Sequence, residues 1–195
     1  MKIKNFFIGV VIILAGILVI IGYNTKEIDI DNDIIVKRTR LMIRTTSLVS
    51  EQIAKEYGAT CKLFEILGES GQSKIRPTFE VDATFDLDMS RKFAFELTKK
   101  YREAMTENKE IQEFYRIEEP EYDLQKNLFP LKKLGVRVAF YENDQLCEEP
   151  YIAQVIFDGA EFHYYVQKPN SDTLKRIFRE SYADAEAYYT SQKAS

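Results

Sequence analysis

The chain of 195 residues has few of the residue types from which many functional sites are built. It has one histidine, which excludes a metal site made of several histidines. It has two cysteines, which excludes both a disulfide-dense scaffold and a zinc site of four thiolates. Acidic residues outnumber basic ones by 31 to 27, so the net charge of −4 gives no support for binding to nucleic acid.

One long uncharged segment stands out against this composition. Residues 6–23 read FFIGVVIILAGILVIIGY. As a helix these residues would span about 27 Å, close to the hydrocarbon core of a bilayer at about 30 Å. A cleaved signal peptide usually has a shorter apolar region followed by small residues, whereas no A-x-A pattern follows this run. We therefore expect residues 1–23 to be an uncleaved anchor that contacts the membrane through residues 6–23.

The residues on either side of the anchor predict its orientation. Lys2 and Lys4 precede the run, whereas Lys26 and four acidic residues follow it within the polar spacer, residues 24–33. Lysine and arginine favour the cytoplasmic side of a membrane. We therefore expect a single-pass cell-membrane protein with a cytoplasmic N-terminus and an extracytoplasmic C-terminal domain.

Hydrophobic periodicity predicts how residues 34–195 fold, and their number fits one domain. Residues 34–57 and 88–107 repeat apolar side chains at helical spacing. Residues 60–67 are expected to form a strand. Residues 78–88 alternate polar and apolar side chains, which predicts a strand with one buried and one solvated face. Such strands are typical of antiparallel sheets.

The C-terminal half of the chain predicts three strands and a helix. The three strands lie within residues 135–167, where an Asp-Gly pair fits a tight hairpin turn. The last helix is expected after Pro169, with Ser171 or Asp172 as its N-cap. The predicted fold is therefore α+β: a transmembrane helix, then a mostly antiparallel sheet of four to five strands with helices on one face, in the order α-β-β-α-β-β-β-α.

An acidic row is the most distinctive polar feature of this domain. Glu80, Asp82 and Asp86 all lie on the polar side of the strand predicted at 78–88. Residues two apart on a strand are about 6.5–7 Å apart, so these carboxylates could meet a basic partner or, with help from neighbouring strands, a hard cation. Exposed strand faces are also commonly charged without binding anything, and the sequence leaves these alternatives open.

The two cysteines and the histidine give weaker signals. Cys61 and Cys147 would both lie outside the cytoplasm, where they could form a disulfide if the compartment is oxidising. His163 alternates with apolar neighbours, so we expect it on the solvated side of its strand. No nucleophile accompanies it in the sequence, and we interpret it as an ordinary strand histidine.

These observations favour binding over catalysis. The sequence has no phosphate-binding loop, metal-ligand cluster or nucleophile motif, so we expect no catalytic residue, no metal and no cofactor. We expect a membrane-anchored domain that binds a protein partner or acts in assembly outside the cytoplasm. A membrane-tethered enzyme that uses acidic residues, with or without a metal, remains an alternative. A domain that binds a small ligand between sheet and helices is another.

Overall fold

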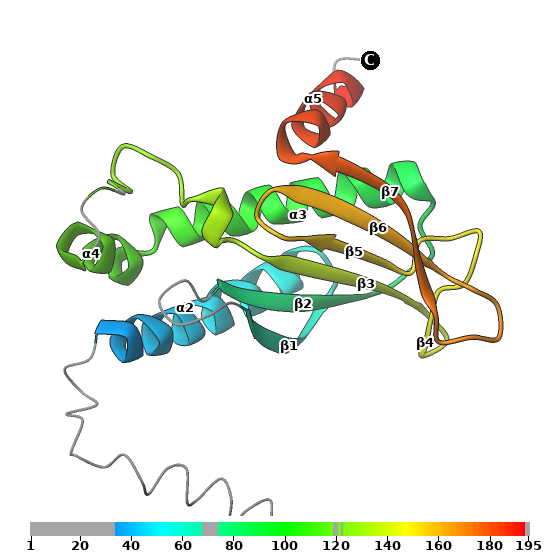
Figure 1. Ribbon diagram of the computed structural model, residues 1–195, viewed down its shortest axis with the longest axis horizontal. Helices are drawn as coiled ribbons and strands as arrows, with labels where there is room; N and C mark the ends of the chain where they lie inside the picture. Colours follow the sequence, from blue (N-terminus) through cyan, green and yellow to red (C-terminus); the bar gives the residue numbers. More distant parts are fainter. Residues whose placement is uncertain (1–33, 68–73, 119–120, 122, 194–195) are drawn as a thin grey trace, which may run out of the picture. The chain divides into compact units, whose positions relative to one another are not determined.

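The computed structural model describes residues 34–67, 74–118, 121 and 123–193 (Figure 1). The predicted anchor and polar spacer lie outside these residues. The chain divides into two compact units after Lys37, and the description below concerns the second unit, which begins at Arg38. None of the described helices combines the length and the hydrophobicity that a membrane span requires.

The described part contains helices and strands in alternating groups. The helices are α2 (Ile34–Glu56), α3 (Leu87–Glu107), α4 (Lys109–Glu118), the short 3₁₀ helix η1 (Leu131–Lys133) and α5 (Tyr182–Lys193). The strands are β1 (Thr60–Leu67), β2 (Lys74–Asp82), β3 (Val136–Glu142), β4 (Gln145–Leu146), β5 (Gln154–Phe157), β6 (Glu161–Gln167) and β7 (Leu174–Ser181).

The strands form one mixed sheet in the order β1-β2-β3-β5-β6-β7, and β4 pairs with β3. Strands β2 and β3 are parallel, whereas the other strand pairs are antiparallel. A parallel pair needs a crossover connection, and α3 and α4 lie in the chain between β2 and β3. The α+β class is confirmed, but the described sheet has seven strands rather than four or five. The expected element order lacked α4, η1, β4 and β7.

Alternating side chains of the strands form one side of the core. Buried residues of this face include Phe79 in β2, Phe140 in β3 and Phe162 in β6. Helix α3 packs against them, with the ring centroid of Tyr101 at 6.4 Å from that of Phe79 and the ring of Phe95 at 6.5 Å from that of Phe162. Burying these large rings stabilises the fold by removing apolar surface from water.

Helices α2 and α5 extend this core on either side of α3. Tyr101 in α3 donates a hydrogen bond to the hydroxyl of Thr46 in α2 at 3.2 Å. Tyr182 and Tyr189 of α5 each place a ring centroid 5.2 Å from that of Phe95. Helix α3 is therefore the central helix of the unit, in agreement with its course along the sheet in Figure 1.

The strand expected at residues 78–88 ends earlier than its pattern predicts. Strand β2 stops at Asp82, and α3 begins at Leu87. The carboxylate of Asp86 accepts a hydrogen bond from the backbone N–H of Met89 at 2.8 Å, so Asp86 is the N-cap of α3. Phe85, expected in the strand, instead packs against Phe140 with ring centroids 5.0 Å apart.

The prediction of a helix that begins after Pro169 is wrong for the residues before Tyr182. The chain forms β7 before α5 begins at Tyr182, and Ser181 caps that helix by accepting a hydrogen bond from the N–H of Asp184 at 3.1 Å. Pairing with β6 decides the conformation of this segment, because it places Phe178 beside Tyr164 in the core. Apolar residues at helical spacing did not reveal this long-range pairing.

Candidate functional site

The structure divides the predicted acidic row. Glu80 and Asp82 lie on β2, whereas Asp86 has left the strand and caps α3. The capping hydrogen bond occupies one of the carboxylate oxygens of Asp86 and fixes its direction toward the helix N-terminus. Asp86 therefore has a structural role, and the acidic site predicted from the sequence is reduced to Glu80 and Asp82.

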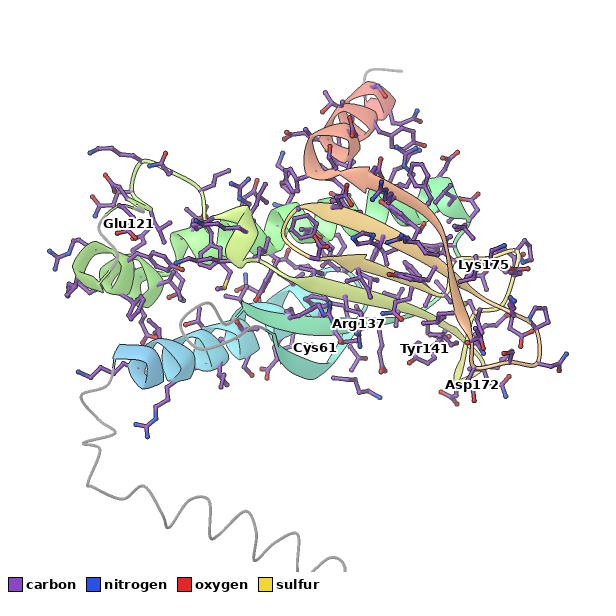
Figure 2. All side chains as sticks on the ribbon, viewed as in Figure 1. Cys61, Glu121, Arg137, Tyr141, Asp172 and Lys175 are labelled. Atoms are coloured by element: carbon purple, nitrogen blue, oxygen red, sulfur yellow. The ribbon has the colours of Figure 1, made fainter. Side chains whose placement is uncertain are left out.

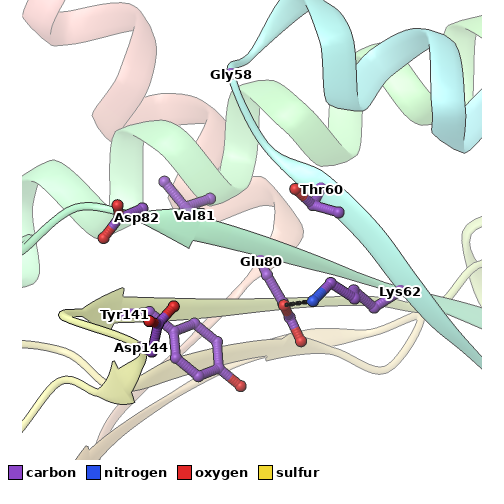
Figure 3. A pocket seen from close by; sticks show the side chains of 8 residues that line it. All are labelled: Gly58, Thr60, Lys62, Glu80, Val81, Asp82, Tyr141 and Asp144. Carbon is purple, nitrogen blue, oxygen red and sulfur yellow. Dashed lines mark ion pairs between the residues drawn. The ribbon is translucent and has the colours of Figure 1, made fainter.

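These two residues line a pocket with polar residues from neighbouring strands (Figure 3). Its volume is ≈ 390 Å³. We call it the β2 pocket, and its polar lining consists of Thr60, Lys62, Glu80, Asp82, Tyr141 and Asp144. Figure 3 shows that these side chains come from β1, β2, β3 and the turn that follows β3. The site therefore combines segments that are far apart in the sequence.

Strand register explains how the chain brings these residues together. Thr60 of β1 lies opposite Glu80 of β2, and Asp82 of β2 lies opposite Tyr141 of β3. The first pairing is within a hairpin, but the second is the parallel pairing that depends on the crossover through α3 and α4. The two sides of the pocket are thus formed by two different strand pairings.

The turn between β3 and β4 adds Asp144 to this site. Asn143 and Asp144 have φ values of 53° and 62°, as a two-residue hairpin turn with two left-handed positions requires. Asparagine and aspartate tolerate this conformation better than most other residues apart from glycine. The sequence Asn143-Asp144 therefore favours a tight turn that places a carboxylate next to Tyr141.

The charges in the β2 pocket are only partly compensated. The ammonium group of Lys62 lies 3.3 Å from a carboxylate oxygen of Glu80. Asp82 and Asp144 make no hydrogen bond or ion pair through their carboxylates with any described residue. Glu80 therefore has a cation beside it, whereas the carboxylates of Asp82 and Asp144 remain available to a ligand.

Tyr141 supplies a neutral donor beside these carboxylates. Its partial burial raises the pKa of its hydroxyl above the ordinary value, and the negative charge of Glu80 raises this pKa further. The hydroxyl therefore keeps its proton at neutral pH. It can donate a hydrogen bond to a ligand, and its ring can contact a cation.

This set of groups fits the binding of a cation. Two free carboxylates and an aromatic ring match an ammonium or guanidinium group, which forms charge-assisted hydrogen bonds with carboxylates. No group of three or more metal-ligating residues is arranged to hold a metal ion in the described part.

The two cysteines are free thiols in the structure. Cys61 lies in β1 opposite Phe79 (Figure 2), whereas the N–H of Cys147 binds the carbonyl oxygen of Phe140 on the side of β3 away from β2. Three strand spacings of about 4.8 Å separate the two positions, well beyond the limit of about 7 Å between the Cα atoms of a disulfide. The disulfide that the sequence allowed is therefore not formed.

His163 is held by its neighbours in the β5–β6 hairpin and in β7. Its Nε2 atom is 3.0 Å from a carboxylate oxygen of Asp158, and its Nδ1 atom is 3.2 Å from a guanidinium nitrogen of Arg176. Because arginine can only donate, Nδ1 accepts this hydrogen bond and Nε2 carries the proton. These contacts give the imidazole a structural role, as expected from the sequence.

Sequence reasoning did not identify four of the polar residues that line the β2 pocket: Thr60, Lys62, Tyr141 and Asp144. The Asn-Asp pair at 143–144 was a signal for a hairpin turn, but nothing local indicated that this turn would approach β2.

Comparison of the chain with models of protein families, with curated proteins and with solved structures finds no match.

Proposed function

We propose that this protein is a single-pass membrane protein whose α+β domain binds a partner protein outside the cytoplasm. Residues 6–23 would anchor it in the cell membrane, and residues 24–33 would separate the anchor from the domain. The uncharged run and the lysines that precede it support this arrangement. The observation that supports binding is the β2 pocket, in which Asp82 and Asp144 have no described partner.

The expected ligand is a lysine or arginine side chain of the partner. A cationic head group would lie between the two free carboxylates, and its aliphatic stem would contact the ring of Tyr141. Pockets that enclose small organic ligands are mainly apolar, whereas charged groups dominate the lining here. This difference favours one side chain of a larger partner over a free small molecule.

The alternatives from the sequence have less support. The enzyme hypothesis relied on three carboxylates, and one of them, Asp86, caps α3 instead of reaching the pocket. The small-ligand hypothesis placed its site between sheet and helices, whereas the β2 pocket lies among β1, β2 and the β3–β4 turn. Protein binding is therefore the function that the described geometry supports best.

A photoreactive amino acid at Thr60 tests this proposal in intact membranes. Thr60 is exposed at the pocket, so a bound partner would be crosslinked there. We expect a crosslinked product in the wild-type background and its loss in the D82N/D144N variant, in which the charges are removed and the shapes are kept. Asparagine also tolerates the left-handed conformation at position 144.

The matched control is E107Q/E186Q, which removes two exposed carboxylates outside the pocket. This variant should retain the product. A captured protein supports the proposal only if its crosslinked segment contains lysine or arginine and if D82N/D144N abolishes the product. A product that is insensitive to D82N/D144N would contradict the role of the β2 pocket.

A further inference from the structure

Strand β7 forms one edge of the sheet. It has eight residues, Leu174–Ser181, and β6 is the one strand that pairs with it in the described part of the chain. The backbone groups on its outer side are therefore a template to which another extended segment can add. This edge is separate from the β2 pocket, which lies near the opposite end of the sheet.

The β7 edge is basic in a chain that is acidic overall. Lys175, Arg176 and Arg179 are exposed, whereas the only acidic residue of the strand, Glu180, is buried. Figure 2 labels Lys175 on this strand. Against the net charge of −4 for the whole chain, this is a local concentration of positive charge.

These positive charges are weakly compensated within the protein. Lys175 has no described partner, and Arg176 contacts a ring nitrogen of His163, which carries no negative charge. Arg179 lies 3.6 Å from Glu161, but both side chains are well exposed, so water screens their attraction. An acidic ligand could therefore bind these residues without displacing a strong internal ion pair.

Two apolar side chains accompany the charges. Leu174 is 36% exposed and Ile177 is 44% exposed. The register of β7 shifts at Ile177, so this residue has no partner on β6. A strand added to the edge would cover part of this apolar surface and gain free energy from its burial.

A second copy of the same edge is a poor match. If two β7 strands paired antiparallel about an axis between Ile177 and Phe178, Arg176 of each copy would lie opposite Arg179 of the other. Like charges in directly opposed positions destabilise a strand pair. Basic residues therefore discourage self-association of the edge but favour a strand that carries carboxylates.

We propose that β7 accepts an extended acidic segment of a partner protein, which adds to the sheet as a further strand. Backbone hydrogen bonds along the edge would supply affinity, and alternate side chains would supply specificity. Carboxylates of the added strand would lie next to Arg176 and Arg179, and an apolar residue would cover Ile177. This inference concerns a different surface from the β2 pocket and does not depend on it.

The test uses the full chain in uncharged detergent micelles and a fluorescent octapeptide of alternating glutamate and valine. We expect saturable binding, measured by fluorescence anisotropy. The same peptide with N-methyl groups on alternate amides keeps its charge but cannot complete the backbone pairing. We expect it to bind at least about tenfold more weakly, which corresponds to about 1.4 kcal/mol.

Charge-reversal variants provide the second arm. K175E/R176E/R179E should bind the unmodified peptide at least about tenfold more weakly, because like charges now face the peptide. The control K55E/K99E/K100E makes the same change in net charge at exposed positions of α2 and α3 and should retain wild-type binding. Circular dichroism verifies that both variants are folded.

Three outcomes would overturn the proposal. Equal binding of the N-methylated peptide would show attraction of charge without strand addition. If heparin displaces the peptide and binds as tightly as the peptide does, the β7 edge is a general site for polyanions. A dimer in sedimentation experiments that persists at saturating peptide and disappears in K175E/R176E/R179E would assign the β7 edge to self-association.

Discussion

The guanidinium group of Arg91 binds both carboxylate oxygens of Glu180, although 89 residues separate the two in the sequence. The Nε–Oε1 distance is 3.0 Å and the Nη2–Oε2 distance is 2.5 Å. Tyr164 donates a further hydrogen bond to Glu180 at 2.7 Å, and the ring of Tyr188 lies 3.6 Å from the Arg91 guanidinium carbon. One ion pair therefore links α3, β6, β7 and α5.

The first prediction concerns the stability that depends on this pair. Replacing Arg91 by methionine leaves the carboxylate of Glu180 buried, at 6% exposure, without its cation. We expect the variant R91M to lose about 3 kcal/mol of unfolding free energy, as is usual when one partner of a buried pair is removed. Urea unfolding followed by circular dichroism measures this loss.

Two matched variants show whether burial is the cause. Arg116 makes the same two-point contact with Glu113, but this pair is exposed, so R116M should cost far less than R91M. The double variant R91M/E180Q removes both charges and should be more stable than R91M alone. Equal losses in R91M and R116M would contradict the argument.

The second prediction separates helix capping from ligand binding at Asp86. The variant D86A removes the oxygen that accepts the hydrogen bond from the N–H of Met89, and we expect a loss of about 1 kcal/mol. D86N should restore most of the stability because asparagine is also a good N-cap. Crosslinking from Thr60 should be unchanged in both variants. Loss of crosslinking in the stable D86N variant would return Asp86 to the binding site.

The third prediction concerns stability at acidic pH. Asp158 accepts hydrogen bonds from the backbone N–H groups of Ala160 and Glu161 and contacts His163. Burial acts to raise the pKa of Asp158, but these hydrogen bonds outweigh burial, so its pKa lies below the ordinary aspartate value. Its folded pKa is thus lower than its unfolded pKa, and its carboxylate stabilises the fold above the unfolded value.

This stabilisation should be lost as pH falls through the ordinary aspartate pKa of about 3.9 and on through the lower folded pKa. The melting temperature of D158N should therefore decrease less between pH 6 and pH 3 than that of the wild type. D172N removes an exposed carboxylate and serves as the control, with a decrease like that of the wild type. If the melting temperature of D158N falls as much as that of the wild type between pH 6 and pH 3, Asp158 does not contribute to the loss of stability in acid.

Local sequence patterns correctly predicted elements such as β2, in which neighbouring residues determine the conformation. Alternation around Phe79 and Val81 identified β2 and its buried face, and both residues are in the core. The same alternation continued through Phe85, because a loop residue that packs into the core is apolar just as a strand residue is. The strand ends at Asp82 and Asp86 caps α3, and alternation of polar and apolar residues carries no information about helix capping.

Long-range contacts decided the parts that the sequence did not predict. Leu174, Ile177 and Phe178 have helical spacing, but β6 and the pair of Glu180 with Arg91 hold this segment as a strand. The β2 pocket has the same origin, because Asp144 reaches β2 through the parallel pairing of β2 with β3. A sequence pattern identifies the face of an element but not the element that packs beside it.

The fourth prediction is that both native thiols react slowly while the protein is folded. Cys147 is 2% exposed and Cys61 is half-buried, and burial raises the pKa of both thiols. At neutral pH the reactive thiolate is therefore scarce and poorly accessible. A maleimide should label the native protein slowly and label both cysteines rapidly in urea. Rapid labelling without urea would contradict the packing of both residues.

The last prediction uses this low reactivity to test the orientation in the membrane. Lys168 is exposed in the loop between β6 and β7, so K168C would add one accessible thiol to a background of two slow ones. In cells stripped of any outer envelope, a membrane-impermeant maleimide should label K168C from outside and leave the wild type almost unlabelled. If K168C reacts only after the cell membrane is opened, the domain lies in the cytoplasm. The lysines before the anchor would then fail to predict its orientation, and a cytoplasmic partner would have to be sought for the β2 pocket.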